Sequence, residues 1–525
     1  MLDAPTLIQI LLGLMASWLR MSIALLISIT FSLVVGIAAG ISRILERIII
    51  PVLDILQSIP ILSFFPLALY SFTILHPVLG PELAAIFLIF TSQVWNIAFG
   101  VYEAVKVMPG ELLEVSRALN LGAGRRFLNL YLPVTFPRIA ANLPASWANG
   151  LYFLVASEII SVGGMKVRLF GIGSVSAGFI ISGRYLELLV SIIAVAAAVL
   201  LTNATVFLPL IRMSERYRME EIPVEVPRVW LDRVFKPLKD VFSHAYLPGH
   251  RELASAFSGI SSRMGEVRRY LWPLIGVIAL TVAFYLTPLL YDISLGAGMM
   301  AEGFVRLGVD VLAMLGFSVL RVVAAILLTL LWVTPLTIII HSRRTLESIV
   351  VPILQVGASI PATLVAPLIM DLVSSYGASI ELGALIIIVL GIQWYLFFII
   401  YGGVKSIPGE EMMLCDALRI KGLGRFRHLY FPRIFPSLVT GLIVAMGGGW
   451  NTLIIAERLE VEGRVWQVDA PGIGKTISMA ISLGDLPLLA SSTIAMASFI
   501  VILNRLLWRR LHGIAVAKLR IPEEV

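Results

Sequence analysis

The chain contains 525 residues, of which 58% are hydrophobic and only 14% are charged, and this composition excludes a water-soluble fold. The net charge of +7 comes from short basic clusters between apolar stretches, a pattern that the positive-inside rule explains and that gives no indication of nucleic-acid binding. The single cysteine, Cys415, excludes an intramolecular disulfide and a cysteine-based metal site. We therefore expect an all-α, multi-pass protein of the cell (plasma or inner) membrane.

Apolar stretches long enough to cross a bilayer predict about eleven membrane-spanning helices. Those of the N-terminal half are expected at 17–41, 48–74, 81–104, 135–160 and 186–211. Those of the C-terminal half are expected at 270–291, 309–340, 349–373, 380–404, 433–456 and 485–508. The stretch 6–41 is long for one helix and contains Arg20, so it fits either one tilted span with an interfacial entry turn or two short passes.

The basic connections predict the orientation of these spans. Placing the segments 106–138 and 405–433 and the polar segment 213–268 in the cytoplasm gives a consistent order, with the N-terminus outside and the C-terminus inside. The proline-containing segment 213–268 divides the chain into a first membrane domain, 1–212, and a second, 269–525. We expect this linker to be a cytoplasmic tether, or to include amphipathic helices that rest on the membrane.

The two membrane domains are related by an internal repeat. A shift of 299 positions aligns Pro109-Gly110-Glu111 with Pro408-Gly409-Glu410, and Glu158 with Glu457. Near the flanks the shift becomes 301, which aligns Ile59-Pro60 with Ile360-Pro361 and Gly171-Ile172-Gly173 with Gly472-Ile473-Gly474. Equivalent loops carry the same charge bias, so the repeat is parallel. A parallel repeat predicts an axis along the membrane normal with a path between the halves, which favours transport over membrane-embedded catalysis.

The most similar part of the repeat is a loop, 108–133 in the first half and 407–432 in the second. Each copy begins with Pro-Gly-Glu, which suits the first turn of a helix. A short helix is expected to run to a glycine-containing break, and a second amphipathic turn to lead into the next span. Two short helices at an angle would form a protrusion that fits a groove of a partner protein.

These loops resemble the coupling loops of binding-protein-dependent ABC permeases, whose pattern is Glu-Ala-Ala, three residues, Gly, a spacer and Leu-Pro. Glu114-Val115-Ser116 takes the place of Glu-Ala-Ala, and Asn120 stands where the family has glycine. Met413-Leu414-Cys415 and Arg419 occupy these positions in the second half. The similarity is greatest to the nitrate/sulfonate/taurine type, through segments 54–60, 448–451, 456–457, 472–474 and 504–510. It implies a fused two-unit permease with the transmembrane fold of type I ABC importers.

The resemblance also implies partners and a substrate class. Two cytoplasmic ABC ATPase subunits would hold ATP and Mg, an extracytoplasmic substrate-binding protein would deliver the solute, and this chain would contain no ATPase site, cofactor or metal of its own. The solute would be a small oxyanion such as nitrate, sulfonate or taurine. The residues expected to contact the ATPases are Gly110, Glu111, Glu114, Arg117, Asn120, Gly122 and Arg126 in the first loop, and Gly409, Glu410, Asp416, Arg419, Gly422 and Arg425 in the second.

Polar and amphipathic residues within the apolar spans are candidates for lining the translocation path. They are Gln57, Ser58, Trp95, Asn96, Asn149, Glu158, Ser359, Gln393, Trp394, Trp450, Asn451 and Glu457. For the amides and tryptophans the alternative is bonding between helices or an interfacial aromatic belt. For Glu158 and Glu457 the alternative is a solvated position in the outer headgroup region. Helices are expected to break before Pro60 and Pro361, which would free backbone groups beside a cavity or form only a packing kink.

Two further patterns bear on other functions. The segment 469–476 superficially resembles a phosphate-binding loop, but Asp469 stands where that pattern needs glycine, and we expect no nucleotide binding there. A secondary transporter driven by an ion gradient is the main alternative function. It would be expected to bury paired charges within the membrane, and the sequence shows few of them.

Overall fold

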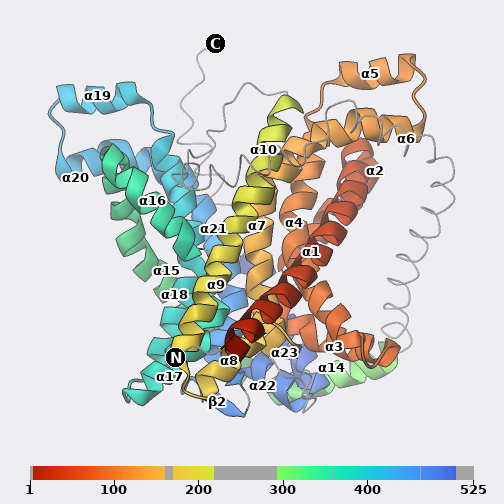
Figure 1. The fold of residues 1–525 in the computed structure, drawn as a ribbon, viewed down its shortest axis with the longest axis vertical. Coiled ribbons are helices and arrows are strands. Elements are labelled where there is room, and N and C mark those ends of the chain that lie inside the picture. Colours follow the sequence, from red (N-terminus) through yellow and green to blue (C-terminus); the bar gives the residue numbers. More distant parts are fainter. Residues whose placement is uncertain are drawn as a thin grey trace.

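The computed structural model describes residues 4–58, 60–159, 169–217, 293–358, 360–461, 463–503 and 506. Its helices form two bundles, with α5 and α19 well apart at one end (top of Figure 1) and α8, α17, α22 and β2 near the other. We call these the loop end and the hairpin end. The predicted span 270–291 lies outside the described residues, as does the linker beyond residue 217.

The first half contains long helices joined by short ones. Its elements are α1 (Ala4–Ile41), α2 (Arg43–Ser58), η1 (Ile61–Phe64), α3 (Phe65–Leu75), α4 (Gly80–Lys106), α5 (Gly110–Ala118), α6 (Ala123–Arg126), η2 (Phe127–Tyr131), α7 (Leu132–Ile159), α8 (Ile172–Ile181), α9 (Tyr185–Thr202), η3 (Asn203–Phe207), α10 (Leu208–Ser214) and η4 (Glu215–Tyr217).

The second half begins with α14 and then follows the same order, and its described residues include a two-stranded hairpin. Its elements are α14 (Ile293–Leu307), α15 (Asp310–Ser342), α16 (Arg344–Ala358), α17 (Ala362–Ser375), α18 (Ile380–Lys405), α19 (Gly409–Ala417), α20 (Gly422–Arg425), η5 (Phe426–Tyr430), α21 (Phe431–Glu457), β1 (Arg458–Val461), β2 (Arg464–Gln467), α22 (Ile473–Leu483) and α23 (Leu486–Leu503). The antiparallel hairpin pairs Arg458 with Gln467 and Val461 with Arg464.

The predicted all-α, multi-pass class is confirmed. Within the described residues, seven helices are long and apolar enough to cross a membrane, and the bent pair α16–α17 raises this number to eight. The stretch 6–41 lies within one continuous helix, α1, because Arg20 is buried in ion pairs and does not interrupt it. The breaks predicted before Pro60 and Pro361 are also confirmed, since α2 ends at Ser58 and α17 begins after Pro361. The predicted span 48–74 is therefore divided into α2, η1 and α3. The predicted span 349–373 is divided into α16 and α17, which meet at 83°.

Helix packing follows the same scheme in both halves. In the first half α4 packs between α1 and α7, and in the second α18 packs between α15 and α21. The halves meet through the broken spans, because η1 contacts α21, α22 and α23 while α17 contacts α7 and α8. The apolar core is continuous across this contact, with Ile61, Leu62 and Phe65 in one cluster with Leu453 and Ile477. The halves thus join towards the hairpin end.

Candidate functional site

The duplicated loops form exposed helices at the loop end. Pro109 and Pro408 immediately precede α5 and α19, and both prolines adopt an extended ψ that directs the chain into the helix. Only Ser116 of α5 and Cys415 of α19 are buried, and these two residues are equivalent. Leu112 and Leu113 of α5 and Met412 of α19 are half-buried against the core, so one side of each helix packs on the bundle and the other faces outward. The predicted contact residues Gly110, Glu111, Glu114, Arg117, Asn120, Gly122, Gly409, Glu410, Asp416, Arg419 and Gly422 are exposed, and Arg126 and Arg425 are half-buried.

Asn120 and Arg419 explain why the related pattern has glycine at this position. They have φ values of 49° and 56° and are the non-glycine residues with positive φ among those described. The next amide in each loop donates back into the helix, Leu121 N to Ser116 O (3.1 Å) and Ile420 N to Cys415 O (2.9 Å). This is the six-residue closure of a Schellman-type C-cap, which requires a left-handed residue. The backbone is therefore retained although the glycine is not.

The exposed face of each loop helix combines apolar and charged side chains. Val115 of α5 and Leu119, which directly follows this helix, are exposed, and so are their equivalents Leu414 and Leu418. Large exposed apolar groups flanked by charges are typical of protein interaction sites. This surface is located outside the apolar spans, so lipid does not account for it.

A polar cluster joins the helix that precedes each loop to the start of the broken span. Tyr102 and Lys106, near the end of α4, donate to the Glu46 carboxylate of α2 at 2.6 and 2.5 Å. The hydrogen bonds from Lys106 and then from Tyr102 lower the pKa of the Glu46 carboxyl group. The second half repeats the arrangement, with Tyr401 donating to Glu347 and the Lys405 ammonium 3.7 Å from the same carboxylate. The start of the broken span is thereby coupled to the helix from which the loop emerges.

A buried charge cluster lies towards the hairpin end of the first half. Arg20 of α1 donates to Glu158 of α7 at 2.7 Å and to Glu82 of α4 at 2.5 and 2.8 Å. Ser17 donates to Glu158 at 2.6 Å and accepts from the backbone N–H of Ile172, the first residue of α8. The second oxygen of Glu158 accepts from Gly173 N at 2.7 Å. Glu158 therefore caps the N-terminus of α8, where a negative charge is favoured.

The second half contains the same cluster. Arg321 of α15 donates to Glu457 of α21 at 2.7 Å and to Glu381 of α18 at 2.6 and 2.7 Å. Ser318 donates to Glu457 at 2.7 Å and accepts from Ile473 N at 3.0 Å. Lys475 N donates to the second oxygen of Glu457 at 2.9 Å. The segment that resembles a phosphate loop thus uses the backbone N–H of Lys475 to bind an internal carboxylate.

The Gly-Ile-Gly segments need glycine at their first position in both halves, because a glutamate carboxylate lies directly against the backbone there. A Cβ atom on Gly171 would come within 2.1 Å of Glu158, and one on Gly472 within 2.1 Å of Glu457. The two glutamate side chains are 2% and 0% exposed, which excludes the solvated headgroup position considered for them. They lie in ion pairs inside one half each.

The repeat in the sequence indicates these clusters, although we did not predict them from it. The shift of 301 that aligns the glycine segments also aligns Ser17 with Ser318 and Arg20 with Arg321. The shift of 299 that aligns Glu158 with Glu457 also aligns Glu82 with Glu381. Polar residues that recur at equivalent positions in apolar spans indicate a shared partner.

Hydrogen bonds between the halves involve two of the predicted path residues. Asn149 of α7 accepts from the Tyr395 hydroxyl of α18 at 2.7 Å. Asn451 of α21 accepts from the backbone N–H of Ile61 at 2.9 Å, next to the break at Pro60. The freed amide of the broken span is thus bound by the opposite half. These polar groups meet where a path between the halves would run.

A further contact joins the halves at the hairpin end. Asp371 of α17 accepts from the Tyr185 hydroxyl, at the start of α9, at 2.8 Å. The same carboxylate lies 3.4 Å from Arg464 of β2. The hairpin, α17 and the first half are therefore connected through one side chain.

The other predicted path residues are spread more widely. Gln57 is exposed on α2 and donates to Asp54 at 2.9 Å. Asn96 is exposed, Trp95 is half-buried, and Gln393 is buried. Trp394 packs against Gly357 of α16, and Trp450 is buried edge-on to Phe499. The side chain of Ser58 and the whole of Ser359 lie outside what the structure describes.

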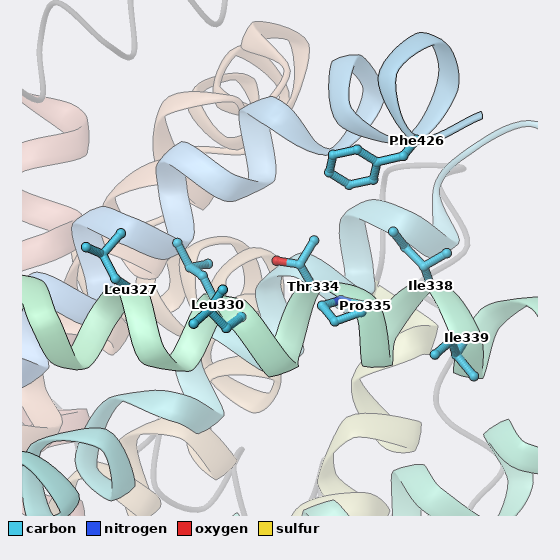
Figure 2. A pocket seen from close by; sticks show the side chains of 8 residues that line it. Leu327, Leu330, Thr334, Pro335, Ile338, Ile339 and Phe426 are labelled. Atoms are coloured by element: carbon cyan, nitrogen blue, oxygen red, sulfur yellow. The ribbon is translucent and has the colours of Figure 1, made fainter. Parts of the chain in front are cut away.

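An apolar groove of about 780 Å³ runs along α15 near the second loop. Figure 2 shows leucine and isoleucine side chains of α15 on one side and Phe426 of η5 across from them. Thr334 supplies its hydroxyl, and the other lining side chains are apolar. A small anion needs several hydrogen-bond donors, so this groove is not a candidate path.

The repeated helical halves, the broken spans and the paired exposed loops define a membrane transport protein built from two permease units. The family model "Binding-protein-dependent transport system inner membrane component" matches the chain twice, at residues 8–215 and 333–520. The chain belongs to this family, whose members are membrane permease components of transport systems. Because both halves match, the expected fused two-unit permease is confirmed.

Individual relatives match over part of their length. The chain is 29% identical over 196 residues to the nitrate import permease NrtB of Leptolyngbya laminosa, which covers 36% of this chain and 64% of that protein. It is 29% identical over 129 residues to the bicarbonate transport system permease CmpB of Synechococcus elongatus, covering 25% and 44%. It is 28% identical over 208 residues to the taurine transport system permease TauC of Escherichia coli, covering 38% and 70%. The chain spans less than two thirds of the nitrate permeases that it matches.

Proposed function

We propose that this chain supplies both membrane-spanning halves of an ABC importer and that α5 and α19 each dock one ATPase subunit in the cytoplasm. The observation that supports this most directly is the pair of loop helices. They share the exposed apolar positions Leu119 and Leu418, and they share the left-handed turn at Asn120 and Arg419. Hydrolysis of ATP takes place on the separate subunits. A binding protein delivers the solute at the hairpin end, on the outside.

The contacts between the halves support a movement that opens the hairpin end. The hydrogen bonds that join the halves include those from Tyr395 to Asn149, from Ile61 N to Asn451 and from Tyr185 to Asp371. Separation of the halves would release the Tyr395 hydroxyl and the Ile61 amide as donors facing the path. Donors released in this way suit an oxyanion, which accepts several hydrogen bonds.

The proposed solute is a small oxyanion of the nitrate, sulfonate or taurine kind. The relatives are named for nitrate, bicarbonate and taurine, and each of these bears an oxyanion group. Uptake of labelled nitrate, taurine and bicarbonate into cells that express the complete system separates these substrates. Uptake of a cationic or neutral solute in place of all three would contradict the proposal.

Docking is tested by placing a charge on the exposed apolar positions. Leu119→Arg and Leu418→Arg together are expected to reduce retention of the ATPase on tagged, purified chain at least about tenfold, because a charge would be buried in the interface. Val78→Arg is the matched control, since Val78 is also a strongly exposed apolar residue but lies in the turn between α3 and α4 at the other end. Retention that survives both loop substitutions would reject α5 and α19 as docking helices.

Stoichiometry gives an independent test. Because both halves are present, the intact complex is expected to contain one copy of this chain and two ATPase domains, as measured by native mass spectrometry. Two copies of this chain per complex would contradict the fused arrangement.

A secondary transporter is the second candidate, and the buried clusters of Arg20 and Arg321 are the observation that favours it. Ionisable groups inside a membrane protein are often ion or proton relays. However, two of the four glutamates that these arginines contact, Glu158 and Glu457, are each bonded to a helix N-terminus at the hairpin end. Proteoliposomes decide between the two: uptake driven by an ion gradient without ATP would favour this candidate, and uptake only with ATP and the ATPase subunits would exclude it.

A further inference from the structure

We infer that Glu158 and Glu457 are positioning residues that hold α8 and α22 in place, and that these two helices close the contact between the halves at the hairpin end. The role of this closure in transport rests on the function proposed above, whereas the closure itself rests on geometry. The inference is carried by the position of the two helices, by their anchoring and by the duplication of the anchor.

The position of α8 and α22 places them between the halves. Ile172, Val175 and Phe179 of α8 are buried in one apolar cluster with Leu364 of α17, which belongs to the second half. Ile473 and Ile477 of α22 are buried with η1 of the first half, and α22 contacts η1 directly. Each short helix therefore covers the broken span of the opposite half. A shift of either helix would open this contact.

The anchoring of α8 and α22 does not come from the bilayer. They have 10 and 11 residues, about half of what a span needs. Their first N–H groups are buried and require acceptors. For α8 these acceptors are Ser17 and Glu158, and Arg20 additionally binds the carbonyl of Phe170 just before the helix at 2.8 Å. Arg321 binds the carbonyl of Pro471 in the same way at 3.1 Å.

The anchor connects the principal elements of a half. In the first half Arg20 lies on α1, Glu82 on α4 and Glu158 on α7, and all three converge on the start of α8. Sliding α8 away from this point would leave buried N–H groups and a buried carboxylate without partners, which is strongly unfavourable. Each half, including its short helix, should therefore move as one body, and the opening should occur between the halves.

Local reporters of accessibility test the inference. In a Cys415→Ser background, Val175→Cys reports on α8 and Ile477→Cys reports on α22, since both side chains are buried at the contact. The protein is placed in nanodiscs without ATP or solute, and the rate of reaction with a water-soluble maleimide is measured. Glu158→Gln is expected to raise the rate at Val175→Cys at least about tenfold and to leave Ile477→Cys within about twofold. Glu457→Gln is expected to have the reverse effect.

Two further variants keep the test decisive. Glu103→Gln is the matched control, because Glu103 is an exposed glutamate on α4, and neither reporter should respond to it. If Glu158→Gln fails to fold, Ser17→Ala removes one hydrogen bond to Glu158 and keeps both charges, and a smaller rise at Val175→Cys is expected. Unchanged protection in both variants would overturn the inference, and so would an equal rise at both reporters, which would show general loosening.

The readout also separates this inference from the proposed function. The labelling uses neither ATP nor solute, so a selective rise at one reporter would support the anchoring even if the chain proved not to be an ABC importer. Transport that fails while labelling behaves as expected would count against the proposed function alone.

Discussion

The left-handed residue Arg419 allows a quantitative test of the loop geometry. A non-glycine residue in this conformation costs roughly 1–2 kcal/mol, while glycine loses roughly 0.5–1 kcal/mol through its larger unfolded-state entropy. Arg419→Gly should therefore stabilise the turn after α19 by about 0.5–1 kcal/mol. This corresponds to an about two- to fivefold decrease in local opening, since RT is about 0.6 kcal/mol. Arg419→Val should increase opening, because a β-branched residue tolerates positive φ least.

Hydrogen exchange measured by mass spectrometry on peptides covering residues 409–421 reports this opening through the amides of Leu418 and Ile420, which donate into the helix. Asn120 provides the matched comparison, because asparagine tolerates this conformation and Asn120→Gly should change exchange less than twofold. Faster exchange in Arg419→Gly, or no difference between Arg419→Gly and Arg419→Val, would refute the assignment of a left-handed turn.

The remaining predictions concern topology and packing. Cysteines at Asn120 and at Arg419 should react with impermeant thiol reagents from the cytoplasmic side only, and labelling from outside would reverse the orientation. Gly171→Ala and Gly472→Ala should each destabilise the protein by about 1–3 kcal/mol, measured as loss of monodisperse protein on heating, because the added methyl group would overlap a buried carboxylate. Gly316→Ala on α15 has open space around it and should have no such effect; equal losses in all three would remove the steric explanation.

The features that could be predicted from the sequence are those set by residues that begin or break helices locally. Prolines at 60 and 361 break helices for reasons internal to the chain, so the bent spans could be placed before the structure was known. The loop helices could also be placed, because Pro-Gly-Glu recurs in both halves. The hairpin 458–467 was missed, although buried Leu459 and Val461 alternate with polar residues and Gly463 follows with φ +87°.

Long-range partners could not be predicted, because their formation depends on how the helices pack. Arg20 and Glu158 are 138 positions apart, and only the packing of α1, α4 and α7 brings them together. The bond from Ile61 N to Asn451 spans 390 positions and joins different halves. A repeat shows which residues are equivalent, but not whether equivalent residues face each other or face the opposite half.

The two loops also differ in how they are braced, and this difference leads to a last prediction. In the second loop Asp416 pairs with Arg425 at 2.7 Å. The equivalent residues of the first loop are Arg117 and Arg126, which repel each other and cannot form this pair.

The two loop helices therefore differ in the charges that they present to a partner. Glu114 and Arg117 are both exposed on α5, whereas the second loop has exposed Met413 in place of Glu114. A docking contact made by Glu114 should consequently be electrostatic where the contact made by Met413 is apolar, and damage to the first loop should reduce transport more. ATP-driven uptake in proteoliposomes is the measurement, with Glu114→Ala compared against Met413→Ala.

Each exposed ionic contact is worth about 0.2–1 kcal/mol, so Glu114→Ala should weaken coupling about 1.5- to fivefold at low salt. Its effect should shrink towards high salt, because screening already weakens the same contact in the unmodified protein. Met413→Ala should give a smaller loss that does not depend on salt. Equal losses at every ionic strength would show that the partner recognises both loops by shape and not by charge. That result would contradict the predicted difference between the loops but not the proposal that both loops dock.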